Sequence, residues 1–190
     1  MKIFSDVGYD SPVSLLWTGN LIGFFQNKSE AGPRALGNRS LLFNAAFGRG
    51  REIVNNIKGR EMFRPLAGSI LYEHASLWFH TEILPNQESP YMSYAVPVKE
   101  DHKSDIPAIL QPDGTCRIQT VKETQNVRFY ELLKQFYVTT TFPVVGNTSF
   151  NLAGESIVET LDEAIDVLHR SDIEFLYLPE SRELIYVENK

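Results

Sequence analysis

Strand-like and helix-like segments are interleaved along this chain, and that order restricts its possible folds more than any other feature. Asn126 can cap a helix whose apolar residues recur at helical spacing between 129 and 136. Thr160 and Glu163 form a capping box ahead of a second amphipathic helix, whose apolar pattern reaches residue 168. A chain with both periodicities is predicted to fold into layers in which helices pack against a sheet.

Short apolar runs beside turn-forming residues are the strand candidates. Because helices and strands do not alternate strictly, we predict a mixed α/β (α+β) fold whose sheet contains both parallel and antiparallel pairs. Residues 8–12 are predicted as a turn ahead of the folded core. The strand candidates cover residues 21–25, 66–72, 118–121, 143–146, 174–178 and 184–187, and a further short helix is expected over 51–58.

The length and the cysteine content are those of one ordinary globular domain. A chain of 190 residues buries enough surface to fold without disulfides or a structural metal, so we expect a single domain over 1–190. Its one cysteine, Cys116, has no partner for an internal disulfide and is expected as a small residue in a strand. Without a bilayer-spanning apolar run or a signal-peptide pattern, we expect a cytoplasmic protein away from membranes.

Basic residues are concentrated in one stretch of an otherwise acidic chain. The net charge is −6, but residues 28–64 hold eight basic residues against three acidic ones, so this window carries +5 and the remainder carries −11. Most of the eight are arginines, whose planar side chains suit bidentate contacts to phosphate. One concentrated basic stretch favours a small anionic ligand in a pocket over nucleic acid on a broad basic face.

Residues 30–40, in the basic stretch, have the composition of an anion-binding loop. Gly32 and Gly37 permit tight turns, and we expect Arg34 and Arg39 to project from the loop. Such a segment can offer backbone N–H groups and guanidinium groups to phosphate oxygens. A loop without a ligand is the alternative that the residues leave open.

Residues 58–65 combine cations with apolar residues. We expect Met62 and Phe63 to face the core, which would direct the cations toward one another. Like charges held together repel unless an anion lies between them. The structural alternative is that carboxylates such as Glu61 neutralise them in salt bridges. The three cations are Lys58, Arg60 and Arg64.

Two further polar segments lie beside strand candidates. In residues 112–121 a turn leads into a strand that places Arg117 and Gln119 on the same face. Residues 146–151 follow directly from an apolar strand, and polar groups at the end of a strand are where α/β sheets usually bind ligands. A turn stabilised by its own hydroxyl and amide groups is the alternative for this segment.

Together these segments resemble a known family. Six segments resemble the C-terminal domain of O-carbamoyltransferases that modify nodulation factors and antibiotics. In chain order they are EAGPRALGNRS, NNIKGREMFRPLAGSIL, SPYM, PDGTCRIQTV, NTSFN and GESIV. The resemblance covers roughly residues 13–178. It implies a YrdC-like fold, a twisted mixed sheet with flanking helices around a basic cavity. It also implies an activity that converts carbamoyl phosphate and ATP into carbamoyl-adenylate with release of pyrophosphate.

The resemblance assigns roles to individual residues. Lys58 and Arg64 are the expected catalytic residues, as the central binders of the phosphate and carbamoyl groups. Mg²⁺ is expected together with ATP, and no metal site is expected in the protein itself. The remaining substrate- and ATP-binding candidates are Arg34, Arg117, Asn147, Ser149, Asn151, Arg39 and Arg60, with a structural role as the alternative for Arg39 and Arg60.

A separate part of the family's proteins carries out the transfer step. It is an N-terminal ASKHA-like domain with a histidine-bound metal, which moves the carbamoyl group to an acceptor hydroxyl. A chain of 190 residues has no room for that domain, and its four histidines match no metal-binding spacing. We therefore expect the transfer half in a longer protein or in a separate subunit. The acceptor and the oligomeric state are not indicated by the sequence.

Departures from the family pattern leave a second function open. Gln111 stands where a histidine precedes the DGT turn, and Ala45, Ala46 and Phe47 replace an acidic residue, a proline and an arginine. The alternative is a non-catalytic nucleotide- or anion-binding module that docks on or regulates a partner. Ligand binding without pyrophosphate formation would distinguish this module from the carbamoyl-activating enzyme.

Overall fold

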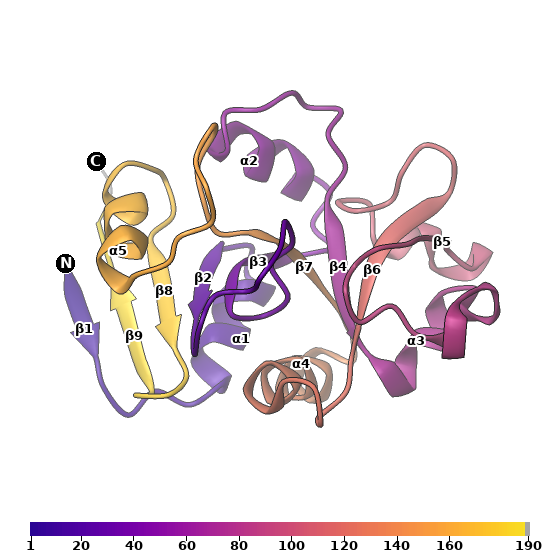
Figure 1. Cartoon of the computed structure of the whole chain (residues 1–190), viewed down its shortest axis with the longest axis horizontal. Helices are drawn as coiled ribbons and strands as arrows, with labels where there is room; N and C mark the ends of the chain where they lie inside the picture. Colours follow the sequence, from indigo (N-terminus) through magenta and orange to yellow (C-terminus); the bar gives the residue numbers. More distant parts are fainter. Residues whose placement is uncertain (189–190) are drawn as a thin grey trace.

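The computed structural model describes residues 1–188, in which nine strands form one sheet in the order β1-β9-β8-β2-β3-β7-β4-β6-β5 (Figure 1). The pairs β2–β8 and β4–β6 are parallel and the other neighbours are antiparallel, so the predicted mixed sheet is confirmed. The strands are β1 (Lys2–Phe4), β2 (Ile22–Phe25), β3 (Arg39–Asn44), β4 (Ala67–Leu71), β5 (Ala95–Pro97), β6 (Thr115–Val121), β7 (Val144–Ser149), β8 (Phe175–Leu178) and β9 (Glu183–Tyr186).

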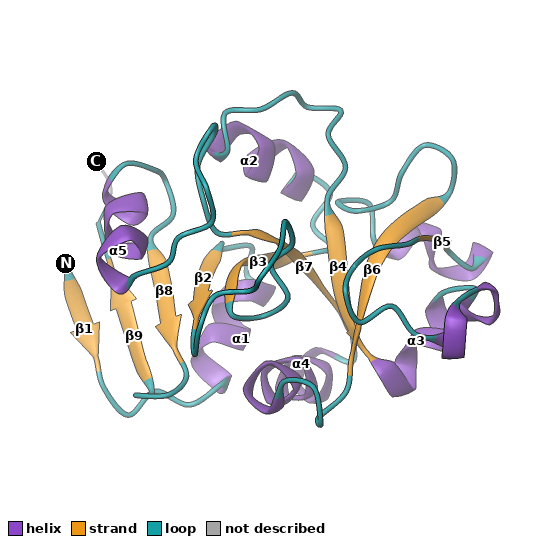
Figure 2. Cartoon of the chain, in the orientation of Figure 1, coloured by secondary structure: helices purple, strands orange, loops and turns teal. Residues whose placement is uncertain are grey.

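Helices flank the sheet on both faces (Figure 2). Successive side chains of a strand point to opposite faces, so Leu41 and Phe43 join one core cluster and Leu42 joins the other. The helices α1 and α4 pack on the Leu42 side, whereas α2 and α5 contribute to the cluster of Leu41. The helices are α1 (Asp10–Trp17), α2 (Gly50–Ile57), α3 (Tyr72–Trp78), α4 (Val127–Thr140) and α5 (Leu161–His169), with 3-10 turns at Thr81–Ile83, Pro85–Gln87 and Glu100–Asp105.

Both helix caps expected from the sequence are present. The side chain of Asn126 accepts a hydrogen bond from the backbone N–H of Phe129 at the start of α4. At the start of α5, Thr160 Oγ1 accepts from the Glu163 N–H, while the Glu163 carboxylate accepts from the Thr160 N–H. These bonds satisfy N–H groups that the first helical turn leaves unpaired.

Three local expectations are wrong. Residues 8–12 are not a turn, because α1 begins at Asp10 with its carboxylate in the first turn. Three of the polar residues after the apolar run 143–146 belong to the strand itself, because β7 continues to Ser149, and only Asn151 follows it. Phe63 and Met62 do not face the core, because the α2–β4 loop lies on the surface. Phe63 is 79% exposed and Met62 is 46% exposed.

No helix within residues 1–188 combines the length and the apolar character that crossing a membrane requires. Cys116 lies in β6 and is fully buried, as expected, and burial raises the pKa of its thiol to about 12. A thiol with so high a pKa stays protonated and behaves as a small apolar residue of the core.

Candidate functional site

The register of three neighbouring strands places a row of polar side chains on one face of the sheet. Ala67 in β4 pairs with Arg117 in β6 on one side and with Asn147 in β7 on the other. Residues paired in this way present their side chains to the same face. Because the middle residue is only an alanine, a hollow remains between the guanidinium group of Arg117 and the amide of Asn147.

The loop before β3 covers this hollow and is held in a fixed shape by Glu30. One carboxylate oxygen of Glu30 accepts from the N–H groups of Leu36 and Asn38 at 2.6 and 2.7 Å. Gly37 has φ +104, and a Cβ there would lie 2.4 Å from the ring of Phe129, so the close approach of the loop to α4 requires glycine. The closed loop carries Arg34 to the rim of the hollow.

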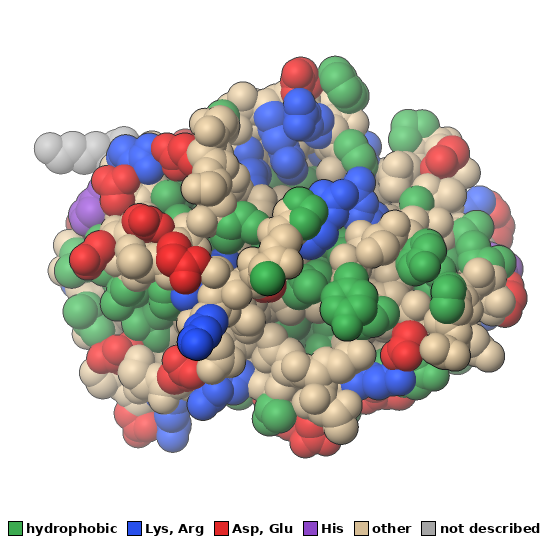
Figure 3. All heavy atoms as spheres, in the orientation of Figure 1, with side chains coloured by type: hydrophobic (Ala, Val, Ile, Leu, Met, Phe, Trp, Pro, Cys, Tyr) green, Lys and Arg blue, Asp and Glu red, His purple; other side chains and the backbone are tan. Residues whose placement is uncertain are grey.

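Two adjoining cavities lie at this place. The smaller has a volume of about 80 Å³, the larger about 490 Å³, and Arg60 and Ser149 line both. Figure 3 shows the Lys and Arg side chains gathered beside α2 and toward the centre of the molecule. The sequence candidates that line the smaller cavity are Arg34, Arg60, Arg117, Asn147 and Ser149, and those that line the larger are Lys58, Arg60, Arg64, Ser149 and Asn151.

Lys58, the first residue after α2, is buried without an opposite charge. Its side chain donates to the Ser149 carbonyl oxygen at 2.6 Å, to Ser149 Oγ at 3.0 Å and to Asn151 Oδ1 at 2.8 Å. The residue is only 4% exposed. Burial, together with the nearby charge of Arg60, lowers the pKa of Lys58 to about 7. A bound anion would stabilise the charged form and raise this pKa again.

Arg60 is held by a neutral partner. Its Nε donates to Oδ1 of Asn55 at 2.7 Å, and Asn55 is a fully buried residue of α2. The amide nitrogen of Asn55 also donates to the carbonyl oxygens of Met62 and Arg64, each at 3.2 Å, and so organises the α2–β4 loop. Burial and the charges of Arg64 and Arg117 lower the pKa of Arg60.

Four cations at the two cavities form no ion pair with a carboxylate of residues 1–188. They are Lys58, Arg60, Arg34 and Arg117. The pKa of Arg117 is lowered by burial and by the charge of Arg34. These four cations surround two adjoining cavities and repel one another. A bound anion is the group that would balance their charge.

Arg64 differs from these four cations. Its Nε lies 2.7 Å from a carboxylate oxygen of Glu61, three positions earlier in the loop, and its side chain is 56% exposed. It lines the larger cavity. The salt bridge proposed as the alternative for residues 58–65 therefore exists for Arg64, while Lys58 and Arg60 remain without one.

Arg39 lies away from both cavities and does not project from the loop as expected. It begins β3, is 3% exposed, and stacks 3.6 Å above the ring of Phe25. Its guanidinium group donates to the carbonyl oxygens of Gln26, Asn27 and Glu159. These contacts join three segments of chain, which is the structural role that the sequence left open for it.

The sequence analysis did not identify two buried polar residues of this region, Asn55 and Ser69. Asn55 is a fully buried amide in α2, and Ser69 is a fully buried hydroxyl in β4. A polar residue within an apolar segment is the available signal, because such a group is buried only when it has a hydrogen-bond partner. Gln119, placed beside Arg117 by strand periodicity, is also buried here and donates to the Leu36 carbonyl oxygen at 3.0 Å.

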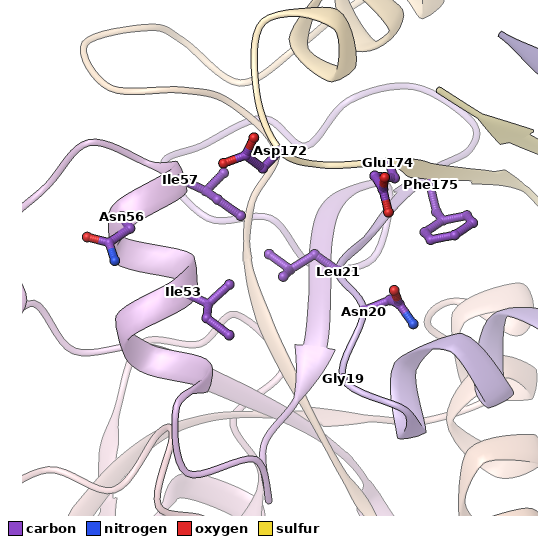
Figure 4. A pocket seen from close by; sticks show the side chains of 9 residues that line it. All are labelled: Gly19, Asn20, Leu21, Ile53, Asn56, Ile57, Asp172, Glu174 and Phe175. Carbon is purple, nitrogen blue, oxygen red and sulfur yellow. The ribbon is translucent and has the colours of Figure 1, made fainter. Parts of the chain in front are cut away.

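A third cavity, of about 330 Å³, lies on the other side of α2 (Figure 4). Leu21, Ile53 and Ile57 form its apolar wall, and Asp172 and Glu174 lie at its edge. Carboxylates at this place repel phosphate, so this cavity does not fit the same ligand. Within residues 1–188 no group of three or more His, Cys, Asp or Glu side chains that could hold a metal ion is present.

The comparisons with known proteins agree with the fold and the motifs. The family model described as "Carbamoyltransferase C-terminus" matches residues 13–182. The nodulation protein NolNO of Sinorhizobium fredii is 39% identical over 83% of this chain, and the 3'-hydroxymethylcephem-O-carbamoyltransferase of Streptomyces clavuligerus is 35% identical over 80% of it. The match spans only 23% and 28% of the length of these two proteins.

Two solved structures share the fold at low sequence identity. Sua5 of P. abyssi, complexed with L-threonine, is 16% identical with a TM-score of 0.64, over 90% of this chain and 46% of that chain. Full-length HypF, in a phosphate- and nucleotide-bound form, is 16% identical with a TM-score of 0.58, over 97% of this chain and 22% of that chain. The expected YrdC-like architecture is confirmed. Because the family model matches residues 13–182, most of this chain, the chain belongs to the carbamoyltransferase C-terminal domain family.

Proposed function

We propose that this domain binds carbamoyl phosphate and ATP in the two adjoining basic cavities and joins them as carbamoyl-adenylate. The observation that carries the proposal is a set of four cations around those cavities that have no carboxylate partner among residues 1–188, namely Lys58, Arg60, Arg34 and Arg117. Both substrates bring phosphate groups, and negative charge accumulates on pyrophosphate as it leaves. Fixed cations directed at such charge are the main catalytic device that phosphoryl chemistry requires.

The sizes of the cavities support a division of labour. The smaller, of about 80 Å³, suits a carbamoyl-sized group, while the larger, of about 490 Å³, suits a polyphosphate chain. Arg60 lines both and would contact both substrates at their junction. Arg34 and Arg117 would line the carbamoyl end, with Lys58 and Arg64 at the phosphate end. Asn147, Ser149 and Asn151 would supply hydrogen bonds, and Arg39 is left out because its donors are engaged by carbonyl oxygens.

The proposed reaction balances with one water molecule. Water displaces phosphate from carbamoyl phosphate and leaves carbamate. A carbamate oxygen then attacks the α-phosphorus of ATP, the bond from that phosphorus to the bridging oxygen breaks, and pyrophosphate leaves with the electron pair. Mg²⁺ would accompany the phosphates of ATP. The residues of this chain hold the two substrates in line and stabilise the departing charge.

Transfer of the carbamoyl group to an acceptor hydroxyl is assigned to a separate domain or subunit. The chain spans about a quarter of the length of the relatives NolNO and the cephem carbamoyltransferase, and we place the transfer step in the part of such proteins that this chain does not match. The domain by itself is therefore expected to stop at the adenylate.

Pyrophosphate release tests the proposal. The purified domain is incubated with ATP, Mg²⁺ and carbamoyl phosphate, and pyrophosphate is measured against mixtures that lack one substrate. We expect release only in the complete mixture and its loss in Lys58→Met. Lys134→Met, which removes an exposed lysine of α4 paired with Glu131, is the matched control and should keep full activity.

Two results would overturn the enzymatic proposal. If both ligands bind without forming pyrophosphate, the domain is the binding module that the sequence left open. If calorimetry detects neither carbamoyl phosphate nor ATP, the basic cavities do not hold these substrates at all.

A further inference from the structure

Three buried side chains form one hydrogen-bonded network, which reaches the smaller cavity through Asn147. Ser69 Oγ donates to Oε1 of Gln119 at 2.8 Å. The amide nitrogen of Asn147 donates to Ser69 Oγ at 2.9 Å and lies 3.2 Å from the same Gln119 oxygen. The residues come from β4, β6 and β7, and each is at most 4% exposed. The network therefore lies on the sheet and is isolated from bulk water.

Two backbone carbonyl groups fix the orientation of both amides in this network. Gln119 Nε2 donates to the carbonyl oxygen of Leu36 at 3.0 Å, and Asn147 Nδ2 donates to that of Ala35 at 3.3 Å. A carbonyl oxygen can only accept hydrogen bonds. If either amide were flipped, its oxygen would face that carbonyl oxygen, and the network would lose a donor. The nitrogen of Asn147 is therefore directed at Ala35, Ser69 and Gln119, and its oxygen is held on the opposite side.

That oxygen, Oδ1 of Asn147, is buried and has no hydrogen-bond partner among residues 1–188. Nη2 of Arg60 is in the same condition, and both residues line the smaller cavity. One atom is an acceptor and the other is a donor. Leaving a buried polar atom unpaired costs about 1–3 kcal/mol each. Because both residues line the same cavity, a ligand bound there that presents an N–H and a carbonyl oxygen offers a partner of the right kind to each atom.

We infer that this network makes the smaller cavity selective for a carbamoyl group over an acyl group of the same size. The inference rests on the proposed function, because it concerns the substrate bound at the same cavity. The carbamoyl NH₂ donates to Asn147 Oδ1, and the carbamoyl oxygen accepts from Arg60 Nη2. Ser69 and Gln119 are positioning residues, because they determine which atom of Asn147 is free. An acetyl group has a methyl in place of the NH₂ and leaves Oδ1 unpaired.

Carbamoyl phosphate and acetyl phosphate form the test pair, since they differ only in NH₂ against CH₃. Their dissociation constants are measured for the wild-type domain by calorimetry, with pyrophosphate as a ligand that does not need the network. We expect the wild type to bind carbamoyl phosphate about 10- to 100-fold more tightly than acetyl phosphate, the size of effect that follows from one unpaired buried acceptor. Equal affinities would overturn the inference.

Two variants separate the network from the cations. Asn147→Leu removes the acceptor at nearly constant volume, and Ser69→Ala removes one anchor of the Asn147 amide. Each should lower the preference for carbamoyl phosphate, Asn147→Leu to nearly one and Ser69→Ala in part. Pyrophosphate affinity should stay within about twofold, because the cations remain in place. The control is Asn56→Leu, an exposed amide of α2 outside both basic cavities.

The outcomes distinguish this inference from the proposed function. If the wild type binds no carbamoyl phosphate, the proposed function fails and the selectivity fails with it. If carbamoyl phosphate binds and both variants keep the wild-type preference over acetyl phosphate, only the network is wrong. If Asn147→Leu does not fold, Ser69→Ala decides: an unchanged preference in that variant overturns the positioning role.

Discussion

The Nζ atom of Lys58 lies 2.8 Å from Oδ1 of Asn151, so a buried ammonium group is held by a neutral amide where a carboxylate would be the ordinary partner. The Ser149 hydroxyl, which also accepts from Lys58, donates to the same amide oxygen at 2.7 Å. This arrangement keeps the positive charge available to a ligand in the larger cavity. No nearby carboxylate offsets the burial of this lysine, and burial together with the charge of Arg60 lowers its pKa to about 7.

Anion binding should therefore depend on pH through Lys58. Above pH 7 the empty protein holds this lysine mainly neutral, whereas a bound phosphate favours the charged form, so binding takes up a proton. The affinity for ATP should fall by up to about tenfold per pH unit between about pH 7.5 and 9. The terminal phosphate of ATP, like a phosphate monoester, loses its last proton at about pH 6 and stays fully ionised in that range. Calorimetry measures the slope, and Lys58→Met should abolish it; the same slope in the variant would contradict the prediction.

The lowered pKa also predicts how stability changes with pH. The unfolded lysine has a pKa of 10.5 and the folded one a pKa of about 7. The folded state is thus favoured by this group above the unfolded pKa, and that contribution is lost as the pH falls toward 7. The stability of the wild type relative to Lys58→Met should increase from pH 7 to pH 9. Urea denaturation of both proteins at the two pH values tests this, and a constant difference would rule it out.

Arg60 and Arg64 should contribute unequally to binding. Arg60 has no carboxylate partner in the part of the chain that the structure describes and is held by the neutral Asn55, whereas Arg64 is half exposed and already paired with Glu61. Arg60→Ala should weaken carbamoyl phosphate binding by about 2–4 kcal/mol, the range for losing a desolvated charge-assisted contact. Arg64→Ala should cost less than about 1 kcal/mol, as exposed ion-paired cations do. Equal losses in the two variants would return Arg64 to the central role that the sequence assigned to it.

Asn55 should act on binding through Arg60. Asn55→Asp keeps an oxygen beside Arg60 Nε but adds a negative charge and removes the donor to the carbonyl oxygens of Met62 and Arg64. Pyrophosphate binding should weaken by about tenfold or more, because the carboxylate neutralises Arg60 and repels the anion. The variant should weaken binding less when Arg60 is already alanine. Additive losses in this double-mutant cycle would contradict coupling between the two residues.

The sequence was sufficient to predict those structural features whose interacting residues lie a few positions apart. The capping residues of α4 and α5 bond to N–H groups three positions away, and both helices were predicted correctly. The run of cations in residues 28–64 also led to the prediction of an anion site, and the structure places Arg34, Lys58, Arg60 and Arg64 of this run around two adjoining cavities. Strand periodicity correctly placed Arg117 and Gln119 on one face, because that relation depends only on the alternation within β6.

Relations between distant segments were not predictable in this way. Arg39 was expected in a loop, but its guanidinium group is bound by the carbonyl oxygen of Glu159, which is 120 positions away. Arg60 turns inward to Asn55, five positions away, whereas Arg64 turns outward to Glu61, three positions away. Both partners are near in sequence, so proximity along the chain does not predict which cation is buried. The fold decides between them by burying α2 and exposing the loop.

In carbamoyl-adenylate, the carbamoyl group of one substrate is joined to the AMP group of the other. The most direct measurement supplies the domain with ATP labelled at the α-phosphorus and carbamoyl phosphate labelled at the carbonyl carbon, with Mg²⁺ and no acceptor, and separates the products at short times. We predict one compound that carries both labels in equal amounts, formed together with pyrophosphate and absent when either substrate is omitted or when Lys58→Met replaces the wild type. Labels that remain in separate compounds, with both substrates bound, would contradict the formation of carbamoyl-adenylate.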